Sequence, residues 1–386
     1  MIYLDNGATS FPKPKEVIDA VLASLSKPAS PGRSGHRPAL EASRIVYGAR
    51  KNVAKLFGVP KPERVVFAAN ITWALNIAIF GMGLKKGDRV LSSSLEHNSV
   101  GRPLNFLASE LGVIWDRVDP SPETGLLDPA EFKKKLTPET KLVVLAHASN
   151  VTGALAPAKA VKEAIGDVPL ILDTAQTAGS VPMEDHGSWA DILTFTGHKG
   201  LLGPTGTGGL CVKEGITLKP LALGGTGSGS EKLVHPDFLP DALEAGTLNT
   251  HGLAGLAAGV KFLLDIGLDR VRAHEMELAR IFSEGVSKIK GVRILGPGPG
   301  SEERVATVSV VLENISSSDL ARRLEEDYGI MVRSGLHCSP LAHGASGTFP
   351  GGASRFSFGW FNTRAEAETA VKALEALAGA KTGKKS

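Results

Sequence analysis

The chain has 386 residues, with 43 basic and 40 acidic side chains, so its formal charge is only +3 and gives no reason to expect nucleic acid or an anionic membrane as a partner. It contains no apolar run of about 18 residues, so no transmembrane helix is expected, and residues 1–15 lack the pattern of a signal peptide. The two cysteines exclude a disulfide framework and favour a reducing cytoplasm, and the ten histidines show no metal-ligand spacing. This length fits two domains of ordinary size.

Residues 14–215 alternate between helical and strand-like segments. Helical periodicity is clear at residues 15–25 and 39–58. Short apolar runs bounded by turn residues predict strands buried on both faces, as in a parallel sheet covered by helices. These runs are residues 64–69, 88–94, 141–149, 169–173, 191–196 and 208–213. The pattern predicts a large α/β domain over residues 14–256.

After a glycine-rich loop at residues 221–230, the pattern changes to strands with helices between them. The predicted helices are residues 252–267, 268–289, 318–329 and 363–377, and the predicted strands are residues 304–314, 330–335 and 355–361. This mixture predicts a smaller α+β domain over residues 257–386. We expect the N-terminal segment, residues 1–13, to associate with the small domain.

The strongest chemical signal is TFTGHKGLLGPTGTGGL at residues 194–210. Lys199 leaves a buried strand among small residues, so its backbone can approach a ligand closely. The Thr196 hydroxyl and the His198 imidazole beside it could hold a phosphate. Taken alone, the segment favours an ordinary solvated loop lysine.

An acidic residue upstream favours a ligand-binding lysine over a solvated one. Asp173 ends an apolar strand, where open α/β sheets bind ligands. Pyridoxal 5′-phosphate (PLP) needs an acidic partner for its pyridine nitrogen, because the protonated ring is the better electron sink. Asp173 can serve, and Gln176 can donate to the ring oxygen. A helix cap explains Asp173 equally well.

Three further polar residues follow predicted strands, each with a plain alternative. Thr72 lies near a helix N-terminus that favours a phosphate, or is an ordinary cap. His97 presents a flat ring that could stack on a pyridine, or is a structural histidine. Asn150 could orient a bound amino acid, or is a turn residue.

Nine motifs, each weak alone, together resemble one family. They are IYLDNGATSFPKP, ITWALN, EHNS, HASNVTG, DTAQTAG, TGHKGLLGPTG, EAGTLNT, VRSGLHCSPLAH and SRFSFGWFNT. From Tyr3 to about residue 378 the chain resembles the cysteine desulfurase and selenocysteine lyase family, in the class V aminotransferase group with PLP fold type I. The resemblance implies an α/β fold with a mostly parallel, seven-stranded type of sheet and a smaller α+β C-terminal domain.

The resemblance also implies roles for the motif residues. Lys199 would hold PLP as a Schiff base, and His97 would stack on its ring and assist catalysis. The implied cofactor residues are Thr72, Ala74, His97, Asn150, Asp173, Gln176, Thr196, His198 and Lys199. The implied substrate residues are Asn150, Arg333 and Arg355, since a guanidinium fork suits a carboxylate. Thr247 resembles a residue that reaches the phosphate of the neighbouring subunit, which implies a homodimer with composite sites.

The two cysteines differ in their surroundings. Cys211 lies in an apolar strand and is expected to be buried and inert. Cys338 lies in a glycine-rich loop near Arg333 and His337, and neighbouring cations favour a reactive thiolate. An incidental loop cysteine is the alternative, but the motif and the family favour a nucleophile.

These residues predict a PLP-dependent cysteine desulfurase, which converts L-cysteine to L-alanine and passes sulfur from a Cys338 persulfide to an acceptor protein or thiol. Selenocysteine lyase, another class V aminotransferase or lyase, and a non-enzymatic scaffold are the alternatives. Two residues depart from the pattern of the family. Trp73 occupies a position where the family commonly has an acidic residue, and Thr196 occupies one where the family more usually has serine. The segment between Cys338 and Arg355 is short and lacks the Ser-Ser-Ala-Cys pattern of the branch with a long mobile cysteine loop.

Overall fold

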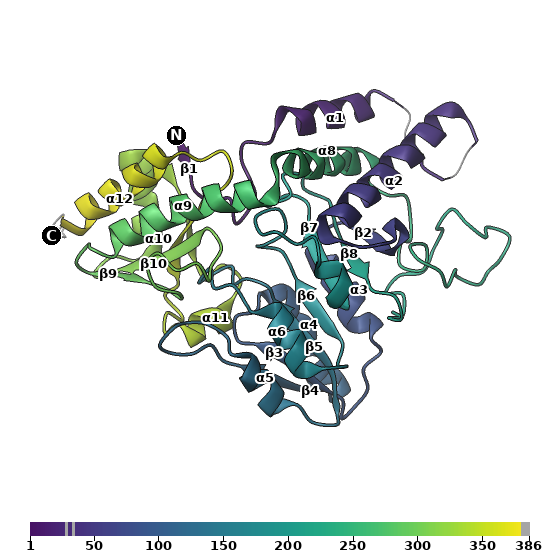
Figure 1. The fold of residues 1–386 in the computed structure, drawn as a ribbon, viewed down its shortest axis with the longest axis horizontal. Helices are drawn as coiled ribbons and strands as arrows, with labels where there is room; N and C mark the ends of the chain where they lie inside the picture. Colours follow the sequence, from purple (N-terminus) through teal and green to yellow (C-terminus); the bar gives the residue numbers. More distant parts are fainter. Residues whose placement is uncertain (28–29, 33–34, 380–386) are drawn as a thin grey trace.

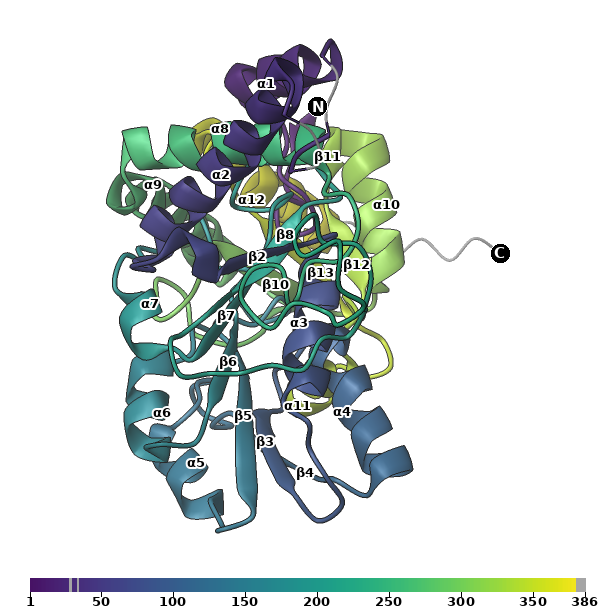
Figure 2. The same cartoon turned by 90° about the vertical axis from the view of Figure 1, so that its right-hand side faces the viewer.

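The computed structural model describes residues 1–27, 30–32 and 35–379, so residues 380–386 of the predicted small domain lie outside it (Figure 1; Figure 2). A seven-stranded sheet forms the centre of the larger part. Its strands are β2 (Val65–Ala68), β3 (Arg89–Ser93), β4 (Ile114–Val118), β5 (Thr140–Ala146), β6 (Leu170–Asp173), β7 (Ile192–Thr196) and β8 (Gly208–Val212). They lie in the order β2-β8-β7-β6-β5-β3-β4, and only β8 runs antiparallel to its neighbours. The predicted α/β fold with a mostly parallel sheet is confirmed.

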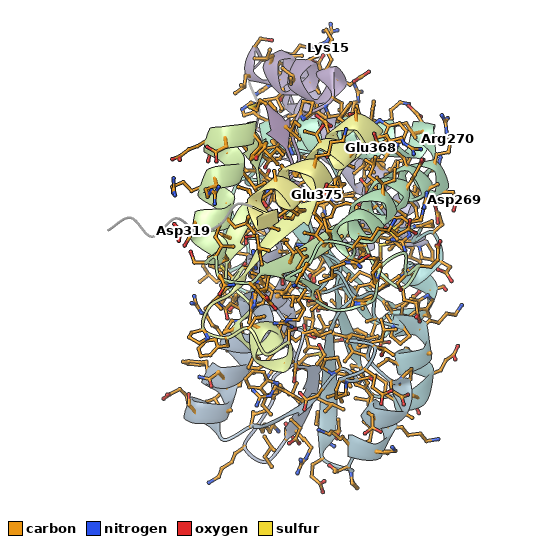
Figure 3. All side chains as sticks on the ribbon, turned by 90° about the vertical axis from the view of Figure 1, so that its left-hand side faces the viewer. Lys15, Asp269, Arg270, Asp319, Glu368 and Glu375 are labelled. Carbon is orange, nitrogen blue, oxygen red and sulfur yellow. The ribbon has the colours of Figure 1, made fainter. Side chains whose placement is uncertain are left out.

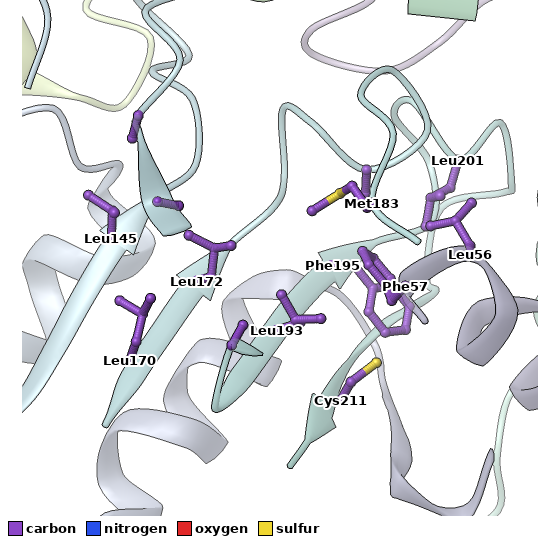
Figure 4. Close-up of a cluster of buried hydrophobic side chains, with 14 of the residues drawn as sticks. Leu56, Phe57, Leu145, Leu170, Leu172, Met183, Leu193, Phe195, Leu201 and Cys211 are labelled. Atoms are coloured by element: carbon purple, nitrogen blue, oxygen red, sulfur yellow. The ribbon is translucent and has the colours of Figure 1, made fainter. Parts of the chain in front are cut away.

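Helices cover both faces of this sheet. They are α2 (Arg37–Phe57), α3 (Ile71–Gly81), α4 (Asn98–Leu111), α5 (Pro129–Lys135), α6 (Ala158–Ile165), α7 (His186–Trp189) and α8 (Thr250–Ile266), while α1 (Lys15–Leu25) packs against α8. Successive side chains of β5 point to opposite faces of the sheet. Val143 and Leu145 pack with α2, α6 and α8, whereas Leu142 and Val144 pack with α3 and α4. Figure 4 shows part of the first cluster, with Cys211 buried among leucine and phenylalanine side chains.

Strand β4 lies at the edge of the sheet and was not predicted. Its residues, IWDRV, include the charged pair Asp116 and Arg117, and only Val118 is fully buried. An edge strand has a partner on one side only and needs no continuous apolar run. Continuous apolar runs therefore indicate the buried strands but not this one.

The small domain is built on an antiparallel sheet with the strand order β12-β13-β10-β9. Its strands are β9 (Val292–Ile294), β10 (Thr307–Leu312), β12 (Arg333–Gly335) and β13 (Ala353–Ser357), and its helices are α9 (Leu268–Val286), α10 (Ser317–Tyr328), α11 (Pro340–Ala345) and α12 (Arg364–Gly379). The predicted strand 330–335 is divided, because β11 (Ile330–Met331) pairs instead with β1 (Ile2–Tyr3). Leu4 belongs to the core of this domain and Ile2 packs against it, whereas the association of the whole segment 1–13 with the small domain stays a prediction. Strand β9 and helix α11 were not predicted.

The change from one core to the other occurs within α9. Leu268 and Val271 pack into the core of the large sheet, whereas Leu278 and Phe282 pack into the core of the small domain. Helix α8 contacts α1 and α2, so residue 257, inside α8, belongs with the large domain. The boundary at residue 257 stays a prediction, and this packing favours a later position.

Many charged side chains lie on the outer faces of the helices, although Arg50 on α2 and Glu275 on α9 are buried. Figure 3 labels six of them, on α1, α9, α10 and α12: Lys15, Asp269, Arg270, Asp319, Glu368 and Glu375. Among the described residues, no single helix is long and apolar enough to span a membrane. Helices α8 and α9 reach that length and hydrophobicity only when taken together, and the pair is bent by 85°.

Candidate active site

A cavity of about 260 Å³ lies at the edge of the large sheet where the parallel strands end. Asp173 is the last residue of β6 and Thr196 the last of β7, while His97 and Asn150 follow β3 and β5. The carboxyl ends of parallel strands meet at one edge, which brings residues that are distant in sequence to one cavity. The predicted cofactor residues that line it are Thr72, His97, Asn150, Asp173, Gln176, Thr196, His198 and Lys199.

Part of this cavity presents polar atoms that suit a phosphate. The first N–H groups of α3, which begins at Ile71, have no partner inside the helix and favour an anion. In the same cavity, Thr196 Oγ1 and His198 Nδ1 are buried, and neither has a hydrogen-bond partner among the described residues. Buried polar atoms are normally paired, so these two unpaired atoms indicate a ligand site. Thr72 Oγ1 lies 3.0 Å from Ser99 Oγ.

Two predicted cofactor residues lie elsewhere. The amide of Ala74 donates to the Asn70 carbonyl at 3.1 Å and its methyl group is buried inside α3, so this amide is not free for a phosphate. Thr247 is exposed, outside the residues that line the cavity of its own chain. A contact between Thr247 and a second chain stays a prediction.

The amine of the half-buried Lys199 and the buried carboxyl group of Asp173 face the same cavity. Burial, followed by the charge of Arg355, lowers the pKa of Lys199 to about 8 from the usual 10.5. Burial raises the pKa of Asp173, and the positive charge of Lys199 opposes this rise. Asp173 Oδ1 accepts a hydrogen bond from the Ala175 amide at 2.8 Å, which fixes the carboxyl group.

His97 is the N-cap residue of α4. Its Nδ1 accepts from the Ser99 amide at 3.0 Å, so the ring proton lies on Nε2. Burial, followed by the charges of Lys199 and Arg333, lowers the pKa of His97 to about 4. The ring is therefore a neutral, flat imidazole beside the lysine.

These features fit PLP. Lys199 offers an amine that is easily deprotonated, and Asp173 offers an acid for a pyridine nitrogen. The unpaired atoms of Thr196 and His198, with the α3 terminus, offer donors for a phosphate. The role of each residue stays a prediction.

The N-terminal segment supports the lysine loop, a role that the sequence analysis missed. The Ser10 amide donates to the His198 carbonyl at 3.0 Å, and Ser10 Oγ donates to the Lys199 carbonyl at 2.9 Å. Lys13 Nζ donates to the same His198 carbonyl at 2.8 Å, and burial lowers the pKa of Lys13 to about 8. The motif DNGATS was the one sequence signal in this segment, and its residue types alone do not indicate a contact with the lysine loop.

Arg355 is buried behind the cavity. It donates through one nitrogen to Asp5 at 2.7 Å and through another to the Asn150 carbonyl at 3.1 Å. Its Nε is buried and has no partner among the described residues. Gly7 allows this packing, because an added Cβ would lie 3.3 Å from both Arg355 Cζ and Gln176 Oε1. Binding of a substrate carboxylate by Arg355 stays a prediction.

Cys338 lies in a groove of about 440 Å³ that shares Thr72, His97 and Ser99 with the cavity. Its thiol is exposed, and Arg333 donates to Sγ at 3.9 Å. The prediction that His337 supplies a second positive charge is wrong. Burial, followed by the charge of Arg355, lowers the pKa of His337 to about 3, so this ring is neutral.

Asn150 lines the cavity, but its side-chain amide bonds the cysteine loop. Nδ2 donates to the His337 carbonyl at 2.8 Å, and Oδ1 accepts from Ser339 Oγ at 2.7 Å. The predicted contacts of this amide with a cofactor or substrate therefore compete with bonds already made. No group of three or more His, Cys, Asp or Glu side chains suited to a metal occurs among the described residues.

Comparisons with known proteins agree with this geometry. Residues 2–369 match the family model of class V aminotransferases. A probable cysteine desulfurase of Methanothermobacter thermautotrophicus is 33% identical over 391 residues, covering 98% of this chain and 95% of the relative. The cysteine desulfurase structure from Thermococcus onnurineus superposes with a TM-score of 0.90 at 33% identity, covering 98% of this chain and 94% of that one. A cysteine desulfurase structure from Escherichia coli gives a TM-score of 0.85 at 26% identity, covering 97% and 94%.

The fold and the site thus define a member of the class V aminotransferases, a group of PLP-dependent enzymes. Within that group, the chain belongs to the cysteine desulfurase family.

Proposed function

We propose that this protein is a PLP-dependent cysteine desulfurase that converts L-cysteine to L-alanine and carries the sulfur on Cys338. One observation supports this most directly. The exposed thiol of Cys338, next to Arg333, lies in a groove that shares His97 with the cavity containing Lys199. A transaminase that only exchanges amino groups would have no use for a thiol at this position.

The residues of the cavity divide the chemistry between them. When bound, PLP would supply an electron sink for the substrate carbon. Lys199 Nζ, with a pKa of about 8, exchanges a proton with the substrate α-carbon. Asp173 holds the proton of the pyridine nitrogen, and Thr196 and His198 hold the phosphate. Arg355 holds the substrate carboxylate.

Cys338 takes the sulfur. Its thiolate attacks the substrate sulfur, so a sulfur–sulfur bond forms while the carbon–sulfur bond breaks. The bonding pair remains with the substrate carbon, which then takes up a proton, and the product is L-alanine. An acceptor thiol attacks the outer sulfur of the persulfide and regenerates the Cys338 thiolate. The guanidinium of Arg333, which donates to Sγ at 3.9 Å, faces the sulfur in both steps.

A second copy of the chain is the proposed structural partner. The long loop between β8 and α8, which extends from the body at the right of Figure 1, exposes Leu223, Leu233, Val234 and Phe238. Several large apolar side chains exposed on one loop are typical of a surface buried by another chain. Thr247 lies at the end of the same loop. A second chain that buries this loop in a homodimer would therefore meet Thr247, as proposed for a composite site.

The reaction products test the proposal. Purified protein supplied with PLP, L-cysteine and a reductant should release alanine and sulfide in equal amounts. A keto acid in place of alanine would indicate a different class V reaction. Selenocysteine lyase activity uses the same residues, and L-selenocysteine in parallel reactions gives the relative preference.

A further inference from the structure

We propose that Asn150 is a positioning residue that holds the Cys338 turn in the conformation needed for sulfur transfer, and this rests on the function proposed above. Two consecutive residues of this turn adopt left-handed backbone conformations, with φ of 51° at His337 and 56° at Cys338. L-residues rarely adopt this conformation, and two in succession require support from their surroundings.

The side-chain amide of Asn150 supplies this support on both sides of the cysteine. It donates to the carbonyl of His337 at 2.8 Å and accepts from the hydroxyl of Ser339 at 2.7 Å. A carbonyl oxygen can only accept, so the orientation of the amide is determined. Asn150 and Ser339 are buried, so water does not compete for these bonds.

The imidazole of His337 anchors the turn from a third direction. His337 Nε2 lies 3.2 Å from the Arg333 carbonyl and must carry the proton, so Nδ1 accepts from His343 Nε2 at 3.2 Å. His343 Nδ1 then accepts from Thr348 Oγ1 at 2.7 Å. This chain of bonds needs the His337 ring to be neutral, because its Nδ1 accepts, and burial lowers the pKa of both His337 and His343.

The same arrangement links the turn to the arginine of the site. The Asn150 carbonyl accepts from Arg355 at 3.1 Å, and the Asn98 amide donates to the Cys338 carbonyl at 2.8 Å. One asparagine on the large domain therefore joins the thiol turn to the buried guanidinium of the small domain. Its loss should release the turn and move the thiol away from the substrate sulfur, while the binding of L-cysteine is retained.

The test uses Asn150→Ala and Ser339→Ala, with Ser149→Ala as the matched control. Ser149 accepts from the Val151 and Thr152 amides in the same loop and makes no bond to the cysteine turn. Two readouts are measured: hydrogen exchange of the peptide that spans residues 336–343, and kcat and KM for L-cysteine. Thermal unfolding checks that each variant is folded.

We expect Asn150→Ala to speed exchange in that peptide and to lower kcat by about tenfold or more with little change in KM, because two hydrogen bonds are lost. Ser339→Ala should act in the same direction, the double variant should be no worse than Asn150→Ala, and Ser149→Ala should match the parent. A raised KM with parent-like kcat and exchange would overturn the proposal and assign Asn150 to substrate binding. If the parent protein does not desulfurate cysteine, the proposed function fails, while hydrogen exchange still tests the turn.

Discussion

Replacing Thr196 by valine tests whether the unpaired hydroxyl serves a ligand. Thr196 ends the buried strand β7, and its Oγ1 has no partner among the described residues. Valine keeps the shape of the side chain and favours a strand. We expect the cofactor-free variant to be as stable as the parent, or more stable by up to about 1 kcal/mol, because an unpaired buried hydroxyl costs roughly that amount.

The affinity of Thr196→Val for PLP should fall, even though its stability is kept or raised. A hydrogen bond to a charged oxygen is worth about 1.5–3 kcal/mol, so PLP should bind Thr196→Val about ten to a hundred times more weakly. Stability is measured by denaturant unfolding of cofactor-free protein, and affinity by titration with PLP followed by absorbance.

Thr194→Val is the matched control. Thr194 lies two residues earlier on β7, and its hydroxyl donates to the Leu172 carbonyl at 3.3 Å. This variant should lose about 1 kcal/mol of stability and keep the PLP affinity of the parent. If Thr196→Val is destabilised as much as Thr194→Val and binds PLP normally, the hydroxyl has a structural role and the phosphate assignment is wrong.

Three further predictions concern the lysine, the dimer and the thiol. The rate at which cofactor-free protein incorporates PLP at Lys199 should rise with pH and level off above about 8, because its lowered pKa makes the neutral amine predominant there; a rise that continues to about pH 10 contradicts this pKa. Subunits with Lys199→Ala mixed with subunits with Thr247→Ala should regain activity, and a fully active monomer would exclude the composite site. Cys338→Ala should lose about a hundredfold or more of its cysteine desulfurase activity but less of its activity on L-selenocysteine, whereas Cys211→Ala should keep most of both; equal rates for parent and Cys338→Ala would refute the desulfurase mechanism.

The strand pattern allowed most of the cavity to be predicted. Asp173 and Thr196 end apolar runs, and His97 and Asn150 follow such runs closely, so a parallel sheet necessarily brings them to one edge. The fold class followed from the same runs. The edge strand β4 was missed because its short sequence, interrupted by Asp116 and Arg117, gives a weak signal.

Other parts of the site depend on contacts between distant segments. Asp5 pairs with Arg355 across 350 residues, and no local pattern connects them. The neutral state of His337 follows from its burial against His343, which cannot be read from a sequence that places it beside a cysteine and an arginine. Asn150 appeared to face a substrate, but the docking of the small domain directs its amide to the cysteine turn.

Locating the sulfur after a single turnover tests most directly whether Cys338 accepts it from L-cysteine. Protein loaded with PLP is mixed with L-cysteine in the absence of reductant, remaining thiols are blocked, and the peptides that contain Cys338 and Cys211 are weighed by mass spectrometry. We expect one additional sulfur atom on Cys338, none on Cys211, and one alanine for each persulfide. Alanine produced while Cys338 stays free of added sulfur would contradict this expectation.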